Sequence, residues 1–283
     1  MKVLVTGSRG QLGRTLLARC PNGLAIVGVD RDDVDIADKG EVDALVKREQ
    51  PDVIVNAAAY TAVDRAESEE DAVRSVNVFG ARNLAATGVR LVQLSTDFVF
   101  DGSANEPYAP NAATAPLGVY GRSKLDGETA VRELLPDNSI VLRTAWLYSE
   151  YGGNFVDTML RLMRERDGVQ VVSDQIGSPT WARSVADVIF AMVARDEISG
   201  TYHWTDGGQA SWYDFACAVQ EEALKTGLLD KPIAIRPVTS EEYAAAATRP
   251  AFSVLDCSTT TAEFGITQVP WRDSLGQMLR EIS

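Results

Sequence analysis

Short runs of apolar, mostly β-branched residues alternate with longer segments whose apolar residues recur at helical spacing. The short runs predict buried parallel strands at Val3–Thr6, Ala25–Asp30, Val53–Ala57, Leu91–Ser95 and Ile140–Arg143. The longer segments predict helices at Gln11–Cys20, Lys39–Glu49, Glu70–Thr87 and Tyr120–Leu134. Because strand and helix alternate and the strands are apolar throughout, we expect an α/β fold with a doubly wound parallel sheet of the Rossmann type.

This alternation becomes less regular after about residue 146. The pattern predicts a strand at Val169–Ser173 and helices at Asn154–Arg166, Trp181–Ala194, Ser211–Lys225 and Trp271–Ile282. We therefore expect residues 1–146 to form the domain with the large sheet. Residues 147–283 are expected to form mainly a smaller, mixed α/β lobe over the carboxyl edge of that sheet. Segments within residues 152–204 are also compatible with packing back on the first domain.

Composition narrows the possible partners and compartments. The 283 residues carry 27 Lys and Arg against 40 Asp and Glu, a net charge of −13, with no basic cluster. This argues against nucleic-acid and membrane partners. No apolar run approaches the roughly 20 residues of a membrane-spanning helix, and the first residues do not resemble a secretory signal. With only three cysteines, the chain is expected to be cytoplasmic. A single histidine, His203, argues against Ser-His-Asp hydrolysis and a histidine-rich metal site.

A glycine-rich turn follows the first predicted strand. Gly7, Gly10 and Gly13 are spaced as Gly-x-x-Gly-x-x-Gly between a strand and a helix, the context that dinucleotide binding requires. Glycines allow a pyrophosphate to approach the backbone, and the N-terminus of the helix favours its negative charge. Asp30, at the end of the second strand, is expected to bind a ribose hydroxyl, which favours NAD, whereas Arg31 beside it suits the 2′-phosphate of NADP. The sequence leaves NADH and NADPH open.

A second set of residues points to proton transfer. Tyr120 and Lys124 lie four residues apart and so share one face of a predicted helix. Thr96 follows the strand that ends at Ser95, and the alternation of a strand turns these two side chains to opposite sides. Tyrosine, with a pKa of about 10, is a poor acid near neutrality. A nearby lysine ammonium is expected to lower that pKa, so that the phenol can exchange a proton with a substrate oxygen held by Thr96.

Together these motifs resemble those of a known protein family. The glycine turn and Tyr120-x-x-x-Lys124 resemble the extended short-chain dehydrogenase/reductases that act on nucleotide sugars. Longer strings narrow the resemblance to the dTDP-4-dehydrorhamnose reductase family, and they extend over nearly the whole chain. These strings are Gly10–Gly13, Asn56–Asp64, Ser95–Gly102, Tyr120–Lys124, Arg143–Trp146 and Arg249-Pro250.

The resemblance implies a function and a set of site residues. The family reduces the 4-keto group of dTDP-4-dehydro-L-rhamnose with NADPH or NADH, the last step of dTDP-L-rhamnose synthesis. Tyr120 would donate the proton, Lys124 would hold the nicotinamide ribose, and Thr96 matches the catalytic hydroxyl. Cofactor contacts would come from Gly7, Gly10, Gln11, Leu12, Gly13, Asp30, Arg31, Asp35, Ile36, Ala58, Ala59, Tyr60, Tyr120 and Lys124. Substrate contacts would come from Thr61, Val63, Thr96, Asp97, Trp146 and Arg249.

Some features depart from the family or admit other interpretations. Arg14 and Thr15 stand where some members carry a glutamate that binds Mg²⁺ in a dimer, which argues against that dimer and against a Mg²⁺ requirement; we expect a monomer or a weak homodimer. Arg143 and Arg183 suit either the substrate pyrophosphate or local acids. The acidic run Glu67–Asp71 with Ser68 predicts a helix cap.

Two other functions fit the same motifs. One is a different nucleotide-sugar epimerase or dehydratase, although Thr96-Asp97-Phe98 supplies only one carboxylate for the acid/base pair that a dehydratase usually needs. The other is a non-catalytic regulatory subunit of methionine adenosyltransferase, which would have no need of Thr96, Tyr120 and Lys124.

Overall fold

A six-stranded sheet forms the centre of the first part of the chain in the computed structural model, which describes residues 1–283. All its neighbouring strands are parallel, in the order β2-β1-β3-β4-β5-β10. The strands are β1 (Lys2–Thr6), β2 (Ala25–Val29), β3 (Val53–Asn56), β4 (Arg90–Thr96), β5 (Ser139–Thr144) and β10 (Gly200–His203). The predicted doubly wound parallel sheet is confirmed. The strand order reverses at β1, so the crevice for a ligand opens at the carboxyl ends of β1 and β3.

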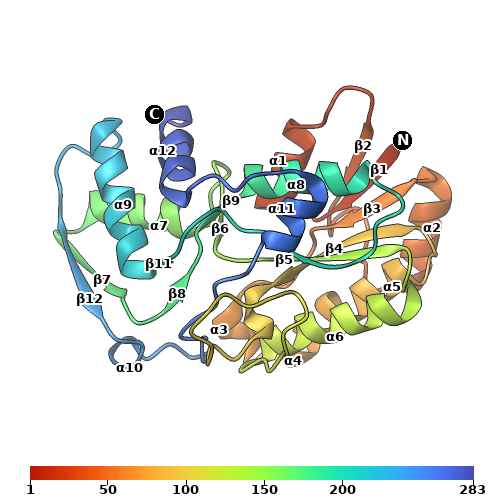
Figure 1. Ribbon diagram of the computed structural model, residues 1–283, viewed down its shortest axis with the longest axis horizontal. Coiled ribbons are helices and arrows are strands. Elements are labelled where there is room, and N and C mark those ends of the chain that lie inside the picture. The colour runs from red at the N-terminus through yellow and green to blue at the C-terminus, as the bar shows by residue number, and fades with distance from the viewer.

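Helices cover both faces of this sheet (Figure 1). Alternate residues of β1 show why: Val3 and Val5 belong to an apolar cluster with α1 and α8, whereas Leu4 belongs to a cluster with α2, α5 and α6. A strand buried on both faces needs apolar side chains at every position, which is the pattern the sequence shows. These helices are α1 (Gln11–Ala18), α2 (Lys39–Glu49), α5 (Ala81–Ala85), α6 (Val119–Leu134) and α8 (Ala182–Val193).

The single helix predicted over residues 70–87 is three consecutive segments. They are α4 (Glu70–Arg74), a π-helical turn η1 (Ser75–Gly80) and α5. A π turn leaves the apolar periodicity largely intact, so the sequence pattern does not reveal it, and such turns are often found at functional sites. Here it places the Asn77 carbonyl against α6, where a Cβ at Gly127 would lie only 2.3 Å from the Asn77 oxygen.

The C-terminal lobe has its own apolar core between α7 (Phe155–Glu165), α9 (Trp212–Lys225) and α12 (Trp271–Glu281). The strand β7 (Gly168–Val172) pairs in parallel with β12 (Ala234–Val238). β12 was not predicted because Arg236 and Pro237 interrupt its apolar pattern; a proline is tolerated on an edge strand. Short pairs join β6 (Leu147–Tyr148) to β9 (Thr180–Trp181) and β8 (Ile176–Gly177) to β11 (Ala210–Ser211). The remaining short helices are α3 (Val63–Ala66), η2 (Asp97–Val99), α10 (Ser240–Tyr243) and α11 (Ser258–Phe264).

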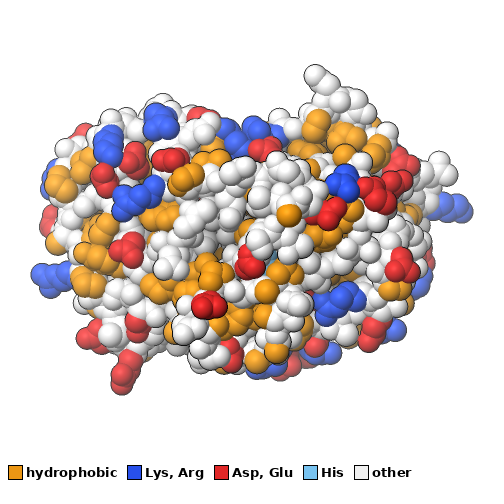
Figure 2. Space-filling view, viewed as in Figure 1, with side chains coloured by type: hydrophobic (Ala, Val, Ile, Leu, Met, Phe, Trp, Pro, Cys, Tyr) orange, Lys and Arg blue, Asp and Glu red, His pale blue; other side chains and the backbone are white.

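Two elements from the second half of the chain lie on the first part. α8 packs against α1, and β10 pairs with β5 at the edge of the large sheet. On the face drawn in Figure 2, acidic and basic side chains are interspersed among apolar ones, and the basic ones do not form a continuous area. None of the helices is long and apolar enough to cross a membrane.

Candidate active site

The glycine turn after β1 packs closely against its surroundings. Gly7 has a φ of +71°, and a Cβ there would lie 2.6 Å from the backbone nitrogen of Ala58, in the segment after β3. A Cβ at Gly13 would lie 2.2 Å from the Gly7 carbonyl oxygen. Both positions therefore require glycine. No side chain caps the N-terminus of α1 at Gly10, so the first N–H groups of this helix remain available for an anion.

A cavity of about 490 Å³ lies beside this turn. Nine of the residues predicted to contact a dinucleotide line it, together with Thr6, Arg9, Val29, Asp32, Val34, Ala57 and Val76; the nine are Gly7, Gly10, Asp30, Arg31, Asp35, Ile36, Ala58, Ala59 and Tyr60. These residues come from the loops after β1, β2 and β3, which the strand order brings together. A glycine turn with a free helix end on one side and Asp30 on the other fits the pyrophosphate and a ribose of a dinucleotide.

Gln11 and Leu12, also predicted to contact the cofactor, have their side chains engaged elsewhere. The Gln11 Oε1 atom accepts hydrogen bonds from Ser149 Oγ (3.0 Å) and Asn154 Nδ2 (2.9 Å). Leu12 is buried in the core beneath α1 and α8. Leu12 therefore has only its backbone N–H to offer a phosphate, whereas Gln11 has its backbone N–H and its side-chain Nε2.

The predicted catalytic hydroxyls meet at the carboxyl end of β4. Tyr120, in the first turn of α6, lies close enough to Thr96 for the Thr96 hydroxyl to lower its pKa. Ser95 is turned away and donates a hydrogen bond to Glu128, as strand alternation predicts. Thr96 Oγ1 donates to Asp97 Oδ1 (2.9 Å), while Asp97 Oδ2 is buried without a partner. Burial raises the pKa of Asp97 to about 6.

The pKa of Tyr120 differs from the expectation. Burial raises it to about 12, and the effect of Thr96 does not reverse this. Lys124 is not among the groups that shift the pKa of Tyr120; one N–H of its buried ammonium donates to the Leu94 carbonyl oxygen (2.6 Å). Burial also lowers the pKa of Lys124 to about 8, opposed by the charge of Glu128. The phenol is protonated at neutral pH, as an ordinary tyrosine is, and the raised pKa makes it a weaker acid than an ordinary tyrosine.

Two further residues hold this region in place: Asn77, which the sequence analysis missed, and Glu67, which it assigned to a helix cap. Asn77 Oδ1 accepts a hydrogen bond from the Tyr60 backbone N–H (2.9 Å), and Asn77 Nδ2 donates to Ser123 Oγ (2.9 Å), beside Lys124. Asn77 is buried in η1, and a polar residue within an apolar helical pattern is the signal that could have revealed it. Glu67 accepts a hydrogen bond from Val119 N (2.8 Å) at the start of α6. The acidic run does not cap the helix that follows it, because no side chain caps α4. Its first residue, Glu67, caps α6 instead.

The predicted substrate residues lie on elements of both parts of the chain. Thr61 is exposed and Val63 is half-buried at the start of α3. Trp146 has a φ of +48° and stacks on Trp212, with ring centroids 3.5 Å apart. Trp212 in turn lines a cavity of about 460 Å³ in the C-terminal lobe, and Arg249 lines it as well.

Arg249 forms an ion pair with Asp64. Its Nη1 and Nη2 atoms donate to the two carboxylate oxygens of Asp64 at 3.0 and 2.7 Å. Arg249 also lowers the pKa of Asp64. The guanidinium therefore lies beside the cavity but already has a counter-ion.

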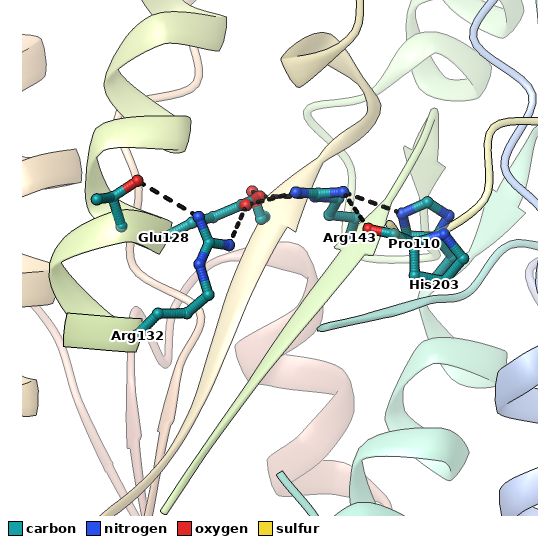
Figure 3. A network of polar contacts seen from close by, with 7 residues as sticks. Pro110, Glu128, Arg132, Arg143 and His203 are labelled. Carbon is teal, nitrogen blue, oxygen red and sulfur yellow. Dashed lines mark hydrogen bonds and ion pairs between the residues drawn. The ribbon is translucent and has the colours of Figure 1, made fainter. Parts of the chain in front are cut away.

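Arg143 and Arg183, each compatible with two roles from the sequence, both pair with local acids. Arg183 pairs with Glu281. Arg143 binds Glu128 through two hydrogen bonds, Nε to Oε1 (2.9 Å) and Nη2 to Oε2 (2.7 Å), both buried. Figure 3 shows this pair extended by Arg132 on one side and by His203 on the other. Burial and the Arg143 charge lower the pKa of His203 to about 4, so this single histidine is neutral at ordinary pH.

Comparison with known proteins identifies the family. Residues 1–283 match the family described as RmlD substrate binding domain. A dTDP-4-dehydrorhamnose reductase of Aggregatibacter actinomycetemcomitans is 40% identical over 97% of both chains. The chain belongs to the dTDP-4-dehydrorhamnose reductase (RmlD) family. A dTDP-4-keto-6-deoxy-D-glucose reductase of Streptomyces niveus is 44% identical over 97% of this chain and 95% of its own length.

Solved structures agree with this RmlD assignment. The dTDP-4-dehydrorhamnose reductase of Bacillus anthracis, in complex with NADP, matches with a TM-score of 0.93 and 37% identity over 99% of each chain. The resemblance based on the sequence motifs is thereby confirmed. A dTDP-glucose 4,6-dehydratase of Streptomyces venezuelae (TM-score 0.79) and a UDP-glucose 4-epimerase of Thermus thermophilus (TM-score 0.81) are 19% and 20% identical, which shows a shared fold.

Proposed function

We propose that this RmlD-family protein reduces the 4-keto group of dTDP-4-dehydro-L-rhamnose to give dTDP-L-rhamnose, with NADPH or NADH as the reductant. The observation that carries the proposal is the meeting of Thr96 and Tyr120 at the carboxyl end of β4, in a chain that matches the family from end to end. The cavity beside the glycine turn supports dinucleotide binding.

In the proposed reaction Tyr120 is the proton donor. When bound, the reduced nicotinamide supplies the hydride that adds to C4 of the sugar. Tyr120 gives its proton to the oxygen that becomes the alcohol, and the Thr96 hydroxyl holds that oxygen within reach. One hydride and one proton are added to the ketone, and a solvent proton restores the phenol. Lys124 has three N–H donors, of which the Leu94 carbonyl takes one; the others are proposed to bind the nicotinamide ribose.

The remaining predicted residues are proposed to bind the rest of the substrate. Asp97, Thr61 and Val63 are assigned to binding of the sugar. Trp146 is assigned to the part of the substrate that lies nearest the C-terminal lobe. Arg249 is assigned to the diphosphate. Because Asp64 already pairs with Arg249, a diphosphate would compete with this carboxylate for the guanidinium, so the ion pair would open when substrate binds.

We propose that residues 1–146 bind the dinucleotide, that 147–283 mainly bind the sugar nucleotide, and that parts of 152–204 serve the first domain. The contact of α8 with α1 and the pairing of β10 with β5 support this division. We further propose that the chain acts as a monomer or a weak homodimer, without a metal ion. Sedimentation at several protein concentrations, with and without Mg²⁺, tests this statement.

The test of the function is an assay with the purified chain, the 4-keto sugar nucleotide and each reduced dinucleotide. We expect loss of the reduced-nicotinamide absorbance with formation of dTDP-L-rhamnose, identified by NMR. Conversion of the sugar without net cofactor oxidation would instead indicate an epimerase or a dehydratase. The Streptomyces niveus relative is named for a 4-keto-6-deoxy-D-glucose nucleotide. The same product analysis therefore includes that sugar, and faster reduction of it would change the proposed substrate while leaving the reaction type.

A further inference from the structure

The arginine of the glycine turn is held by two carboxylates. Arg9 lies between Gly7 and Gly10, and its Nη1 atom forms an ion pair with Asp32. Its Nη2 atom lies 3.9 Å from Asp33. Both aspartates belong to the loop after β2, and Asp33 is fixed there because its Oδ2 accepts a hydrogen bond from Asp30 N (2.9 Å). Arg9 thus connects the glycine turn to the loop after β2 within the lining of the dinucleotide cavity.

Asp30, the residue expected to bind the ribose, occupies the centre of the same region. One of its oxygens accepts a hydrogen bond from Arg9 N (2.8 Å) and the other from Arg31 N (2.9 Å). These bonds fix the carboxylate in the cavity wall without neutralising its charge. A carboxylate at this position accepts a hydrogen bond from a 2′-hydroxyl and repels a 2′-phosphate.

The charges around the cavity are therefore unbalanced. Its lining carries two cations, Arg9 and Arg31, and three carboxylates, those of Asp30, Asp32 and Asp35. Arg31 takes part in no ion pair, so it is the one cation there without a counter-ion; Asp33 adds a further carboxylate beside Arg9. A phosphate ester carries about −1.5 to −2 charges at neutral pH, and it would enter this acidic surrounding with only Arg31 free to meet it.

We propose that Asp32 and Asp33 determine the dinucleotide preference of this protein, making NADH the better ligand by holding Arg9 away from a 2′-phosphate. This inference rests on the proposed function, since it concerns the cofactor of that same site. It goes further, because it assigns a role to two residues that no motif singles out. NADPH can bind, but Arg9 must first leave its aspartates.

The experiment is a fluorescence or calorimetric titration of the purified chain with NADH and with NADPH, without sugar substrate. We expect tighter binding of NADH in the unaltered protein. In Asp32→Asn/Asp33→Asn, the ratio of the NADPH to the NADH dissociation constant should fall by about fivefold, the scale of an exposed ion pair. Asp43→Asn is the matched control: Asp43 pairs with Lys39 on the surface of α2, so it removes a similar pair without changing the ratio.

A second background separates release of Arg9 from a mere loss of negative charge. In Arg9→Gln, adding the two asparagines should change the ratio clearly less than it does when Arg9 is present, because only the loss of negative charge remains and the cation they would release is gone. Tighter binding of NADPH than NADH by the unaltered protein would overturn the proposal, as would an equal gain in the Arg9→Gln background. Failure of both dinucleotides to bind would overturn the proposed function and this inference with it.

Discussion

Glu67 and Val119 are joined by a hydrogen bond of 2.8 Å from the Val119 backbone N–H to the Glu67 carboxylate. Val119 is the first residue of α6 and immediately precedes Tyr120. The preceding residue, Gly118, has no side chain to cap the helix, so a carboxylate 52 residues away along the chain does so. The Glu67 carboxylate also places a negative charge at the positive end of α6, the helix that carries Tyr120, the proposed proton donor.

Replacing Glu67 should therefore loosen the start of α6. Glu67→Ala is expected to lower the free energy of unfolding by about 1 kcal/mol, the usual value of a helix cap, and to lower kcat because Tyr120 is less well positioned. Urea unfolding and steady-state kinetics measure the two effects. Glu70→Ala, at an exposed position of α4, is the control; an equal effect there would contradict a role for the cap.

Tyr120→Phe removes the phenolic hydroxyl while keeping the ring that packs against Ala66, Val73 and Val119. We expect kcat to fall by about 10² to 10⁴-fold, the contribution of a positioned acid, with the dissociation constant of the dinucleotide nearly unchanged. Tyr151→Phe, at a residue that stacks with Arg14, serves as the control. If Tyr120→Phe weakened dinucleotide binding as strongly as turnover, Tyr120 would have a structural role instead.

Deprotonation of Lys124 should produce the alkaline limb in the pH dependence of the reaction rate. Its pKa is lowered from 10.5 to about 8, so the ammonium of the free protein loses its charge as the pH rises through about 8, and kcat/KM should fall there. Lys124→Arg is expected to remove this limb, because a guanidinium keeps its proton in this range, even if the overall rate is lower. An unchanged limb in Lys124→Arg would assign it to another group.

The buried pair of Glu128 and Arg143 should contribute more to stability than an exposed pair does. Glu128→Ala leaves the Arg143 charge buried without a counter-ion and is expected to cost about 3–5 kcal/mol of unfolding free energy. Asp126→Ala, two residues earlier on α6, breaks an exposed pair with Arg74 and should cost about 0–1 kcal/mol. Similar losses in denaturant titrations of the two variants would show that the pair in Figure 3 contributes little.

Gly7→Ala tests the close approach beside the dinucleotide cavity. The new Cβ would meet the Ala58 backbone, so we expect a loss of stability and dinucleotide affinity reduced on the order of tenfold or more. Gly88→Ala is a matched control, because Gly88 has a similar φ of +77° with no atom near its Cβ position. It should show only the backbone strain, about 1–2 kcal/mol. Equal effects of both substitutions on affinity would exclude the steric explanation.

Local sequence patterns alone were sufficient to predict much of the fold and several residues of the candidate site. Five of the six predicted strands belong to one parallel sheet because each is apolar on both sides, a property written in consecutive residues. The glycine turn and the pair Tyr120 and Lys124 were recognised because their spacing within one turn or one helix needs no distant partner. The strand order then placed the loops after β1, β2 and β3 around one cavity, as a doubly wound sheet requires.

Only the tertiary structure decided which charges meet. Arg143 pairs with Glu128, Arg249 with Asp64 and Arg9 with Asp32. From the sequence, Arg143 suited a substrate pyrophosphate as well as a local acid, and Arg249 was expected to contact the substrate. An ion pair between residues that are as much as 185 positions apart leaves no periodic trace in the chain, because it depends on how whole elements pack. Burial acts in the same way: it raised the pKa of Tyr120 where the neighbouring lysine alone predicted a lower value.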